Sequence, residues 1–299
     1  MFVIVHRANQ LGNRLFLFAH LIACAAEHRV HLVNFGFEEY ARYFETTSQD
    51  LFCRYPPKRS WFGKDARTRE TLSDWAGRIA DSVAEGKLRG LQNSALIILR
   101  SGHETTLANP GGKVNLDSEK FLSTLRSRQI IVFSGPLFRD VSSFPKHAVS
   151  IREYFRPLGI FRRNVDALIR SVREDCDVVV GVHIRRGDYR TFMRGRFFYS
   201  DEQYVRLMQR IQGLFAGQRV HFLMCSNEER AQSAFSQFTV FSGSGQFIED
   251  LYALARCDFM VGPPSRFSAW ASFYGQVPLY VVMDPSKEPT IVDFSICGG

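Results

Sequence analysis

Two adjacent arginines, Arg185 and Arg186, stand just after an apolar run at 178–182 that contains four valines. A run rich in β-branched residues is typical of a strand buried on both faces. Ligands of open α/β sheets bind beyond the carboxyl ends of such strands. Because a forked guanidinium matches phosphate oxygens, the two arginines indicate a phosphate or diphosphate site. An exposed basic turn after a core strand explains the same residues equally well, so both interpretations stay open.

Polar residues also follow other apolar runs in the C-terminal half. Ser226 and Asn227 follow one run, and Ser265 and Ser268 follow another. If the runs are parallel strands, their carboxyl ends meet at one edge of a sheet, so we expect these side chains near the arginines. The two serines precede a predicted helix, whose free N–H groups can bind phosphate. A simple N-cap is the alternative for either serine.

An acidic pair, Glu249 and Asp250, lies in a helix predicted at 246–257. A carboxylate accepts hydrogen bonds only, so it can accept two from the N1–H and N2–H edge of guanine. The alternative is an exposed acidic pair on a solvated helix face. The residue types alone favour that alternative.

Alternating strands and helices predict a parallel, doubly wound α/β sheet in the C-terminal half. A strand, a polar turn and a helix at the N-terminus predict a second α/β unit. We place a domain boundary between 1–155 and 156–299. The expected strands are at 2–6, 30–33, 95–100, 129–134, 178–182, 221–225, 239–241, 258–262 and 278–282. The expected helices are at 11–27, 71–85, 150–156, 162–174, 201–214, 228–237, 246–257 and 268–274.

The chain of 299 residues has a formal net charge of +8. An excess of basic residues favours a nucleotide, a nucleic acid or an anionic membrane surface as partner. The alternative is that the positive surface charge serves only solubility. The basic residues are dispersed, which argues against nucleic-acid binding. Six scattered cysteines without metal-site spacing predict free thiols in a reducing compartment. With no stretch that approaches a membrane span, we expect a cytoplasmic protein, perhaps bound peripherally at the inner membrane face.

Three stretches, in this order, resemble the α1,2/α1,6/protein-O-fucosyltransferase superfamily, most closely its bacterial α1,2-fucosyltransferase-like group. Residues 10–16, QLGNRLF, are similar to the family's GLGNQMF. Residues 183–189, HIRRGDY, fit the family motif HxRRxD. Residues 249–257 and 265–270 are similar to its DL…C…SSFSWW block. Arg266 stands where that block has a smaller residue.

The resemblance implies a GT-B fold, with two Rossmann-like domains facing a central cleft. It implies that GDP-fucose binds the C-terminal domain, that a glycan acceptor enters from the N-terminal side, and that no metal is needed. The expected reaction is inverting transfer of fucose, α1,2 to galactose. One alternative is a GT-B transferase that uses a different nucleotide sugar. Another is a non-catalytic protein that binds a GDP-sugar or nucleic acid.

The resemblance also carries residue roles. It assigns the diphosphate to Arg185, the guanine to Asp250 and the neighbourhood of the nucleoside to His183. Asp188 could act as a base for the acceptor hydroxyl or brace an arginine, and we favour bracing. The predicted catalytic residues are Arg185, Asp188 and Asn13. The predicted donor-binding residues are His183, Arg185, Arg186, Ser226, Asn227, Asp250, Ser265, Arg266, Phe267, Ser268 and Gly12.

Overall fold

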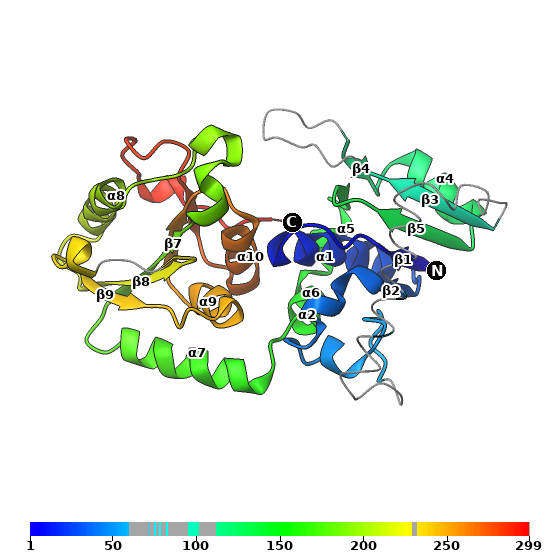
Figure 1. The fold of residues 1–299 in the computed structure, drawn as a ribbon, viewed down its shortest axis with the longest axis horizontal. Helices are drawn as coiled ribbons and strands as arrows, with labels where there is room; N and C mark the ends of the chain where they lie inside the picture. Colours follow the sequence, from blue (N-terminus) through cyan, green and yellow to red (C-terminus); the bar gives the residue numbers. More distant parts are fainter. Residues whose placement is uncertain are drawn as a thin grey trace. The chain divides into compact units, whose positions relative to one another are not determined.

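A computed structural model describes residues 1–59, 71, 75, 78, 82, 95–101, 112–228 and 232–298. Over these residues the chain divides into two compact units, 1–158 and 159–298 (Figure 1). Each unit is built around a parallel sheet. No helix in the described part of the chain is both long and apolar enough to cross a membrane. Most of the helix expected at 71–85 lies outside the described residues.

The first unit has a four-stranded sheet in the order β2-β1-β5-β3, and all its pairings are parallel. The helix α1 (Leu11–Glu27) follows the first strand and is buried along most of its length, because its apolar residues cover more than one face. The strands are β1 (Phe2–Ile4), β2 (Leu32–Asn34), β3 (Leu96–Arg100) and β5 (Ile130–Ser134). Smaller elements are α2 (Glu38–Ala41), β4 (Val114–Asn115), α4 (Glu119–Ser127), β6 (Phe138–Arg139), α5 (Ser143–Lys146) and α6 (Ala148–Tyr154).

The second unit has a five-stranded parallel sheet in the order β11-β10-β7-β8-β9. The central strand β7 is buried at every residue, as its valine-rich sequence predicts. α9 packs against α7 and α10, and α8 lies on the opposite side of the sheet (Figure 1). The strands are β7 (Val178–Ile184), β8 (Val220–Ser226), β9 (Thr239–Ser242), β10 (Phe259–Gly262) and β11 (Leu279–Val281). The helices are α7 (Gly159–Val172), α8 (Asp201–Leu214), α9 (Phe247–Leu254) and α10 (Arg266–Gly275).

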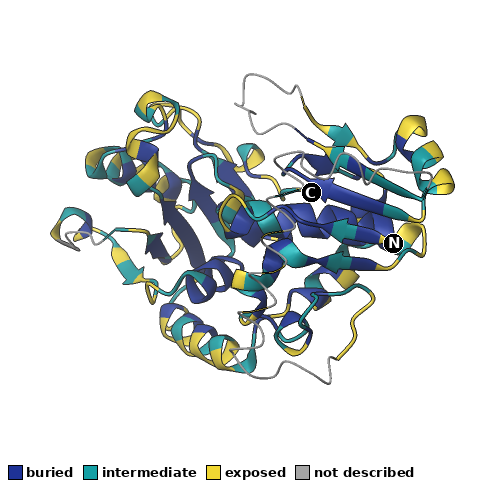
Figure 2. Cartoon of the chain, turned by 45° about the vertical axis from the view of Figure 1, so that its right-hand side comes forward, coloured by how far each residue is buried: buried dark blue, intermediate teal, exposed yellow. Residues whose placement is uncertain are grey.

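Both sheets are mostly buried, whereas helices such as α4, α7 and α8 each expose one face (Figure 2). This pattern confirms the predicted α/β class. The helix predicted at 228–237 is wrong, since the described part of that segment forms only a 3-10 turn at Gln232–Phe235. Phe235 is buried in the core and Phe238 packs against the same core, whereas Ser233 and Ser236 are exposed. Serine hydroxyls also compete for backbone groups, which favours turns.

Gly181, in the middle of β7, permits close packing of α9 on the sheet. A Cβ at this position would lie 2.8 Å from Leu254 Cδ2 and 2.9 Å from Cys257 Sγ. We therefore expect Gly181→Ala to lower the free energy of unfolding by roughly 1–3 kcal/mol, the usual cost of overpacking a core. Urea denaturation measures this change.

The matched control is Gly213→Ala in α8, where an added Cβ meets nothing within 4 Å. Alanine has the higher helix propensity, so this variant should be more stable than the wild type, by up to about 1 kcal/mol. Equal stability of the Gly181→Ala variant and the wild type would contradict the close packing described above.

Candidate active site

The ends of the neighbouring strands β10, β7 and β8 bring polar residues to one edge of the second unit's sheet. His183 lies near the end of β7, opposite Cys225, and Ser226 ends β8. The β10 strand ends at Gly262, where an added Cβ would lie 3.0 Å from both Cβ and the carbonyl oxygen of His183. Glycine thus lets the loop that leads to Ser265 pass close to the end of β7. The predicted gathering of strand-end residues is confirmed.

Arg185 is held in place by Asp188. Its Nε and Nη2 donate to the two carboxylate oxygens, at 3.1 and 2.9 Å. The guanidinium also lies over the ring of Tyr189, with Cζ 5.2 Å from the ring centroid. Two of the five N–H donors of this guanidinium thus bond to Asp188. The bracing contact expected of Asp188 is present, and it fixes the plane of the arginine fork.

Arg186 has different partners from its neighbour. Its Nη2 donates to Asp201 Oδ1 at 2.9 Å and to the carbonyl oxygen of Tyr199 at 3.2 Å, at the start of α8. The side chains of Arg185 and Arg186 are only 15% and 16% exposed. The alternative of an exposed basic turn is therefore wrong. Arg186 ties the strand end to α8, whereas Arg185 is braced within the turn.

The two residues after β8 hold the backbone of the turn at 185–190, which we call the arginine turn. Asn227 Oδ1 accepts from the N–H of Arg186 at 2.9 Å, and Glu228 Oε1 accepts from the N–H of Gly187 at 3.1 Å. Glu228 Oε2 also accepts from Arg190 at 2.8 Å. Sequence reasoning missed Glu228 because it placed this residue in a helix. Its position after the strand-end Ser226 and Asn227 could have indicated the role.

Gly187 is required at its position in the arginine turn. Its φ of +24° lies in the region that side chains disfavour. A Cβ would also lie 2.7 Å from Asn227 Nδ2. The glycine in HIRRGD thus permits the contact between the ends of β7 and β8.

His183 joins the end of β7 to α10. Its Nδ1 and Ser268 Oγ are hydrogen-bonded at 2.6 Å, and its ring lies 5.0 Å from the ring of Phe267. Burial lowers the pKa of His183 to about 3, with a further contribution from the Arg185 charge. The imidazole is therefore neutral at physiological pH. Ser268 is buried inside α10, so the N-cap alternative is wrong for this serine.

Ser265 is the N-cap of α10. Its hydroxyl accepts from the N–H of Phe267 at 3.2 Å, which confirms the capping alternative for this residue. The loop before it is joined to the arginine turn, because the hydroxyl of Tyr189 donates to the carbonyl oxygen of Pro264. Arg266 is exposed in the first turn of α10. The N-terminal end of this helix therefore lies next to the arginine turn.

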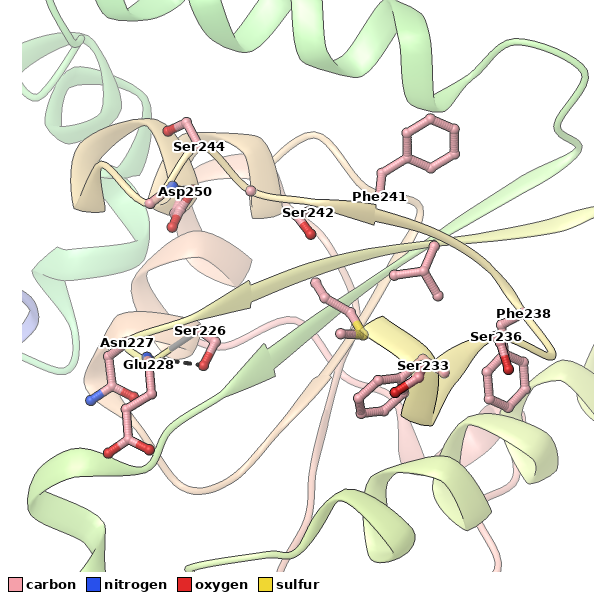
Figure 3. A pocket seen from close by; sticks show the side chains of 15 residues that line it. Ser226, Asn227, Glu228, Ser233, Ser236, Phe238, Phe241, Ser242, Ser244 and Asp250 are labelled. Atoms are coloured by element: carbon pink, nitrogen blue, oxygen red, sulfur yellow. Dashed lines mark hydrogen bonds between the residues drawn. The ribbon is translucent and has the colours of Figure 1, made fainter. Parts of the chain in front are cut away.

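A pocket of about 1040 Å³ opens at β8, β9 and the turns that follow them (Figure 3). Asp250 of α9 lies at one end of it and is only 6% exposed. Glu249 is buried as well, and its Oε1 accepts from Asn164 Nδ2 of α7 at 2.6 Å. The expectation of an exposed acidic pair is wrong, because α9 packs between α7 and α10. The lining residues are Met224, Ser226, Asn227, Glu228, Ser233, Phe235, Ser236, Phe238, Val240, Phe241, Ser242, Gly243, Ser244, Gly245 and Asp250.

The loop after β9 wraps closely around the Asp250 carboxylate. Oδ1 accepts from the N–H of Gly245 at 3.3 Å, and a Cβ on Gly243 would lie 2.4 Å from the same oxygen. Burial raises the pKa of Asp250 to about 6, although hydrogen bonds from the loop oppose this shift. At neutral pH the side chain is therefore a desolvated carboxylate at the end of a pocket. Such a group gains most from a ligand that offers N–H donors.

Two predicted site residues lie in the first unit. Gly12 is buried and Asn13 half-buried, both in the first turn of α1, whereas all the other predicted site residues belong to the second unit. Within the described ranges, no three His, Cys, Asp or Glu side chains are grouped so that they could hold a metal ion.

Residues 146–284 match the family described as Glycosyl transferase family 11. An alpha-1,2-colitosyltransferase of Escherichia coli is 24% identical over 190 residues, which are 58% of this chain and 64% of that protein. The chain thus spans just under two thirds of the length of this relative.

Solved structures of fucosyltransferases share the fold. Arabidopsis thaliana FUT1, in complex with GDP, has a TM-score of 0.59 at 12% identity. The match covers 99% of this chain and 73% of the FUT1 chain. The fucosyltransferase NodZ from Bradyrhizobium has a TM-score of 0.53 at 17% identity, over 94% of this chain and 95% of its own. POFUT1 in complex with GDP-fucose has a TM-score of 0.51 at 12% identity, and the match covers 97% of this chain and 96% of the POFUT1 chain. These structures show that the chain has the fold of fucosyltransferases.

The likeness to these structures confirms the predicted GT-B class of fold. The region matched by the family at 146–284 contains the HxRRxD residues, Asp250 and Ser265. Gly12 and Asn13 lie outside it. The residues that surround the pocket and the arginine turn therefore all fall within the stretch that resembles glycosyltransferases.

Proposed function

We propose that this protein is an inverting, metal-independent glycosyltransferase that moves fucose from GDP-fucose to a hydroxyl of a glycan. The observation that carries the proposal is the meeting of three features at one sheet edge. These are the braced Arg185, the capped end of α10 at Ser265, and the pocket that ends at buried Asp250. Related structures that contain GDP or GDP-fucose support the choice of nucleotide.

Arg185 supplies positive charge to the diphosphate. As the bond between the sugar's anomeric carbon and the β-phosphate oxygen breaks, negative charge grows on the phosphate. A guanidinium already held by Asp188 meets that charge without reorganisation, which is the basis of electrostatic catalysis. Backbone N–H groups at the start of α10 add to the same field. In this proposal the arginine does the work that a metal ion does in other transferases.

Asp250 selects guanine in the proposed donor site. Its carboxylate can accept from both N1–H and N2–H of the base, a pair of donors that uracil and cytosine do not present. The pocket volume, about 1040 Å³, is at the upper end of the range for small-ligand sites. His183, neutral and tied to Ser268, borders the nucleoside in this arrangement. The proposed donor contacts thus extend from Asp250 through His183 to Arg185.

The acceptor hydroxyl needs only weak activation if the sugar departs as an oxocarbenium-like group. Asp188 is engaged by Arg185, so we assign it the bracing role rather than that of a base. Asn13 stays a predicted catalytic residue and Gly12 a predicted donor-binding residue. The name of the E. coli relative supports an α1,2 linkage, and galactose stays the predicted acceptor sugar. The cytoplasmic location stays a prediction.

A second candidate donor carries colitose instead of fucose, since the E. coli relative is a colitosyltransferase. Colitose lacks one of the hydroxyls of fucose. Both sugars could therefore use the same diphosphate and guanine contacts, and a pocket distinguishes such a pair through the hydrogen bonds it makes to the extra hydroxyl. An assay of transfer from each donor decides between fucose and colitose.

Calorimetric titration with GDP, UDP and CDP tests the proposed nucleotide. We expect GDP to bind at least about tenfold more tightly than the pyrimidine nucleotides, because loss of the Asp250 contacts costs about 1.4 kcal/mol or more. Transfer is then assayed with the fucose and colitose donors on a panel of galactosides, with and without EDTA. Absence of GDP binding, or of GDP release with every acceptor, would overturn the proposal.

A further inference from the structure

Tyr189, the residue directly after HIRRGD, belongs to the arginine turn and contacts the loop that leads to α10. It is buried, with 6% of its surface exposed. Its hydroxyl donates to the carbonyl oxygen of Pro264, 75 residues further along the chain. The side chain of Ser265, the N-cap of α10, lies close to the same hydroxyl. One side chain thus joins the ends of β7 and β10.

The ring of Tyr189 also contacts Arg185. The guanidinium carbon lies 5.2 Å from the ring centroid, within the range of a cation–π contact. The ring of Phe192 stacks on the ring of Tyr189. The two ring centroids are 5.2 Å apart and the ring planes differ by 29°. Asp188 holds an edge of the guanidinium, and Tyr189 covers its face. These contacts leave the Arg185 side chain little freedom to change its orientation.

We propose that Tyr189 is a positioning residue that fixes Arg185 and the Ser265 end of α10 relative to each other around the diphosphate. The inference rests on the proposed function. A diphosphate has a fixed size, so groups that bind it from two loops must keep one spacing. Misplacement of a catalytic group by about 1 Å can cost on the order of 100-fold in rate. Tyr189 contacts both loops through two different parts of its side chain.

Tyr199 offers a matched control within the same unit. It is also buried, and its hydroxyl also donates to a backbone carbonyl, that of Val282, at 2.7 Å. Val282 follows β11, so this hydrogen bond does not involve the loop at Pro264. Removal of either hydroxyl leaves a backbone carbonyl without this donor, half-buried at Pro264 and buried at Val282, and should cost about 1 kcal/mol of stability in each case. Only the Tyr189 hydroxyl is expected to matter for turnover.

The test compares Tyr189→Phe with Tyr199→Phe. Tyr189→Phe keeps the ring over Arg185 and removes the link to Pro264 and Ser265. We expect kcat for transfer from GDP-fucose to fall about tenfold, the equivalent of one hydrogen bond, while the Kd for GDP stays within about threefold. Tyr199→Phe should lower the melting temperature to a similar degree and leave kcat and KM within about twofold. Activities are measured well below both melting temperatures.

Tyr189→Leu removes the ring as well and should lower kcat further, to about 100-fold below the wild type. A kcat of Tyr189→Phe within twofold of the wild-type value would overturn the inference alone. Equal losses of kcat in Tyr189→Phe and Tyr199→Phe would also overturn it, because the role would then be general stability. A wild-type protein that binds no GDP would overturn the proposed function, and this inference with it.

Discussion

Replacement of Arg185 by alanine is expected to lower kcat for transfer from GDP-fucose by about 100- to 1000-fold, the range seen when a preorganised donor to a developing anion is removed. The physical reason is that negative charge develops on the diphosphate during the reaction. The diphosphate gains negative charge at the leaving oxygen only as the sugar departs, so Arg185 contributes most in the transition state. The Kd for GDP should rise less than kcat falls. Stopped-assay kinetics and calorimetry measure the two quantities.

The chain provides a matched arginine for this experiment. Arg219 donates two hydrogen bonds to the carboxylate of Asp177, from Nε at 3.2 Å and from Nη2 at 3.0 Å. Asp177 directly precedes β7, and Arg219 directly precedes β8. Arg219→Ala removes an equivalent ion pair and one positive charge at the opposite edge of the sheet, so its kcat should stay within about twofold of wild type. Turnover near the wild-type rate in Arg185→Ala would exclude Arg185 from the reaction. Equal losses in both variants would point to a general effect of charge.

Asp250→Asn is expected to raise the Kd for GDP by about 10- to 100-fold, since hydrogen bonds to a charged group contribute about 1.5–3 kcal/mol. An amide cannot accept from both N–H groups of guanine, because one of its two ends is itself a donor. The preference for GDP over UDP should therefore shrink together with the affinity. The matched variant is Glu249→Gln, which alters the neighbouring buried carboxyl that faces Asn164 instead of the pocket. If Asp250→Asn keeps the GDP affinity and the base preference of the wild type, the proposal that Asp250 contacts guanine is wrong.

The raised pKa of Asp250, about 6, adds a pH dependence with two opposite signs. Only the ionised carboxylate accepts both N–H groups, so GDP affinity should fall as the pH drops below about 6, towards tenfold per pH unit. Stability of the free protein changes the other way. Because the folded pKa lies above the ordinary value of 3.8, this group's contribution to stability is full below about pH 4 and is lost as the pH rises through 6.

Two titrations separate these effects. Calorimetry of GDP binding between pH 5 and 8, in the wild type and in Asp250→Asn, gives the affinity; the variant corrects for protonation of the GDP phosphate itself. Urea denaturation over the same range, without nucleotide, gives the stability. A GDP affinity with the same pH profile in both proteins would show that Asp250 does not titrate against guanine.

The sequence alone predicted several elements closely. The helices at 11–27 and 201–214 were predicted at the bounds that α1 and α8 have in the structure. Apolar spacing and a capping residue are local signals, and Ser200 caps α8 in a complete capping box. The helix predicted at 228–237 was wrong even though Ala234, Phe235 and Phe238 have helical spacing, so this local pattern did not decide the structure of the segment.

The sequence by itself determined the elements, the parallel sheet, and the gathering of HIRRGD and the two serines at one sheet edge, because residue periodicity and strand order are properties of the chain alone. Only the tertiary structure paired Arg186 with Asp201, buried Asp250, and brought Glu228 and the loop at Pro264 to the arginine turn. These outcomes depend on partners far away in the sequence, such as Asp201 for Arg186 and Pro264 for Tyr189. Side-chain direction and desolvation are set by such distant contacts, which no local pattern specifies.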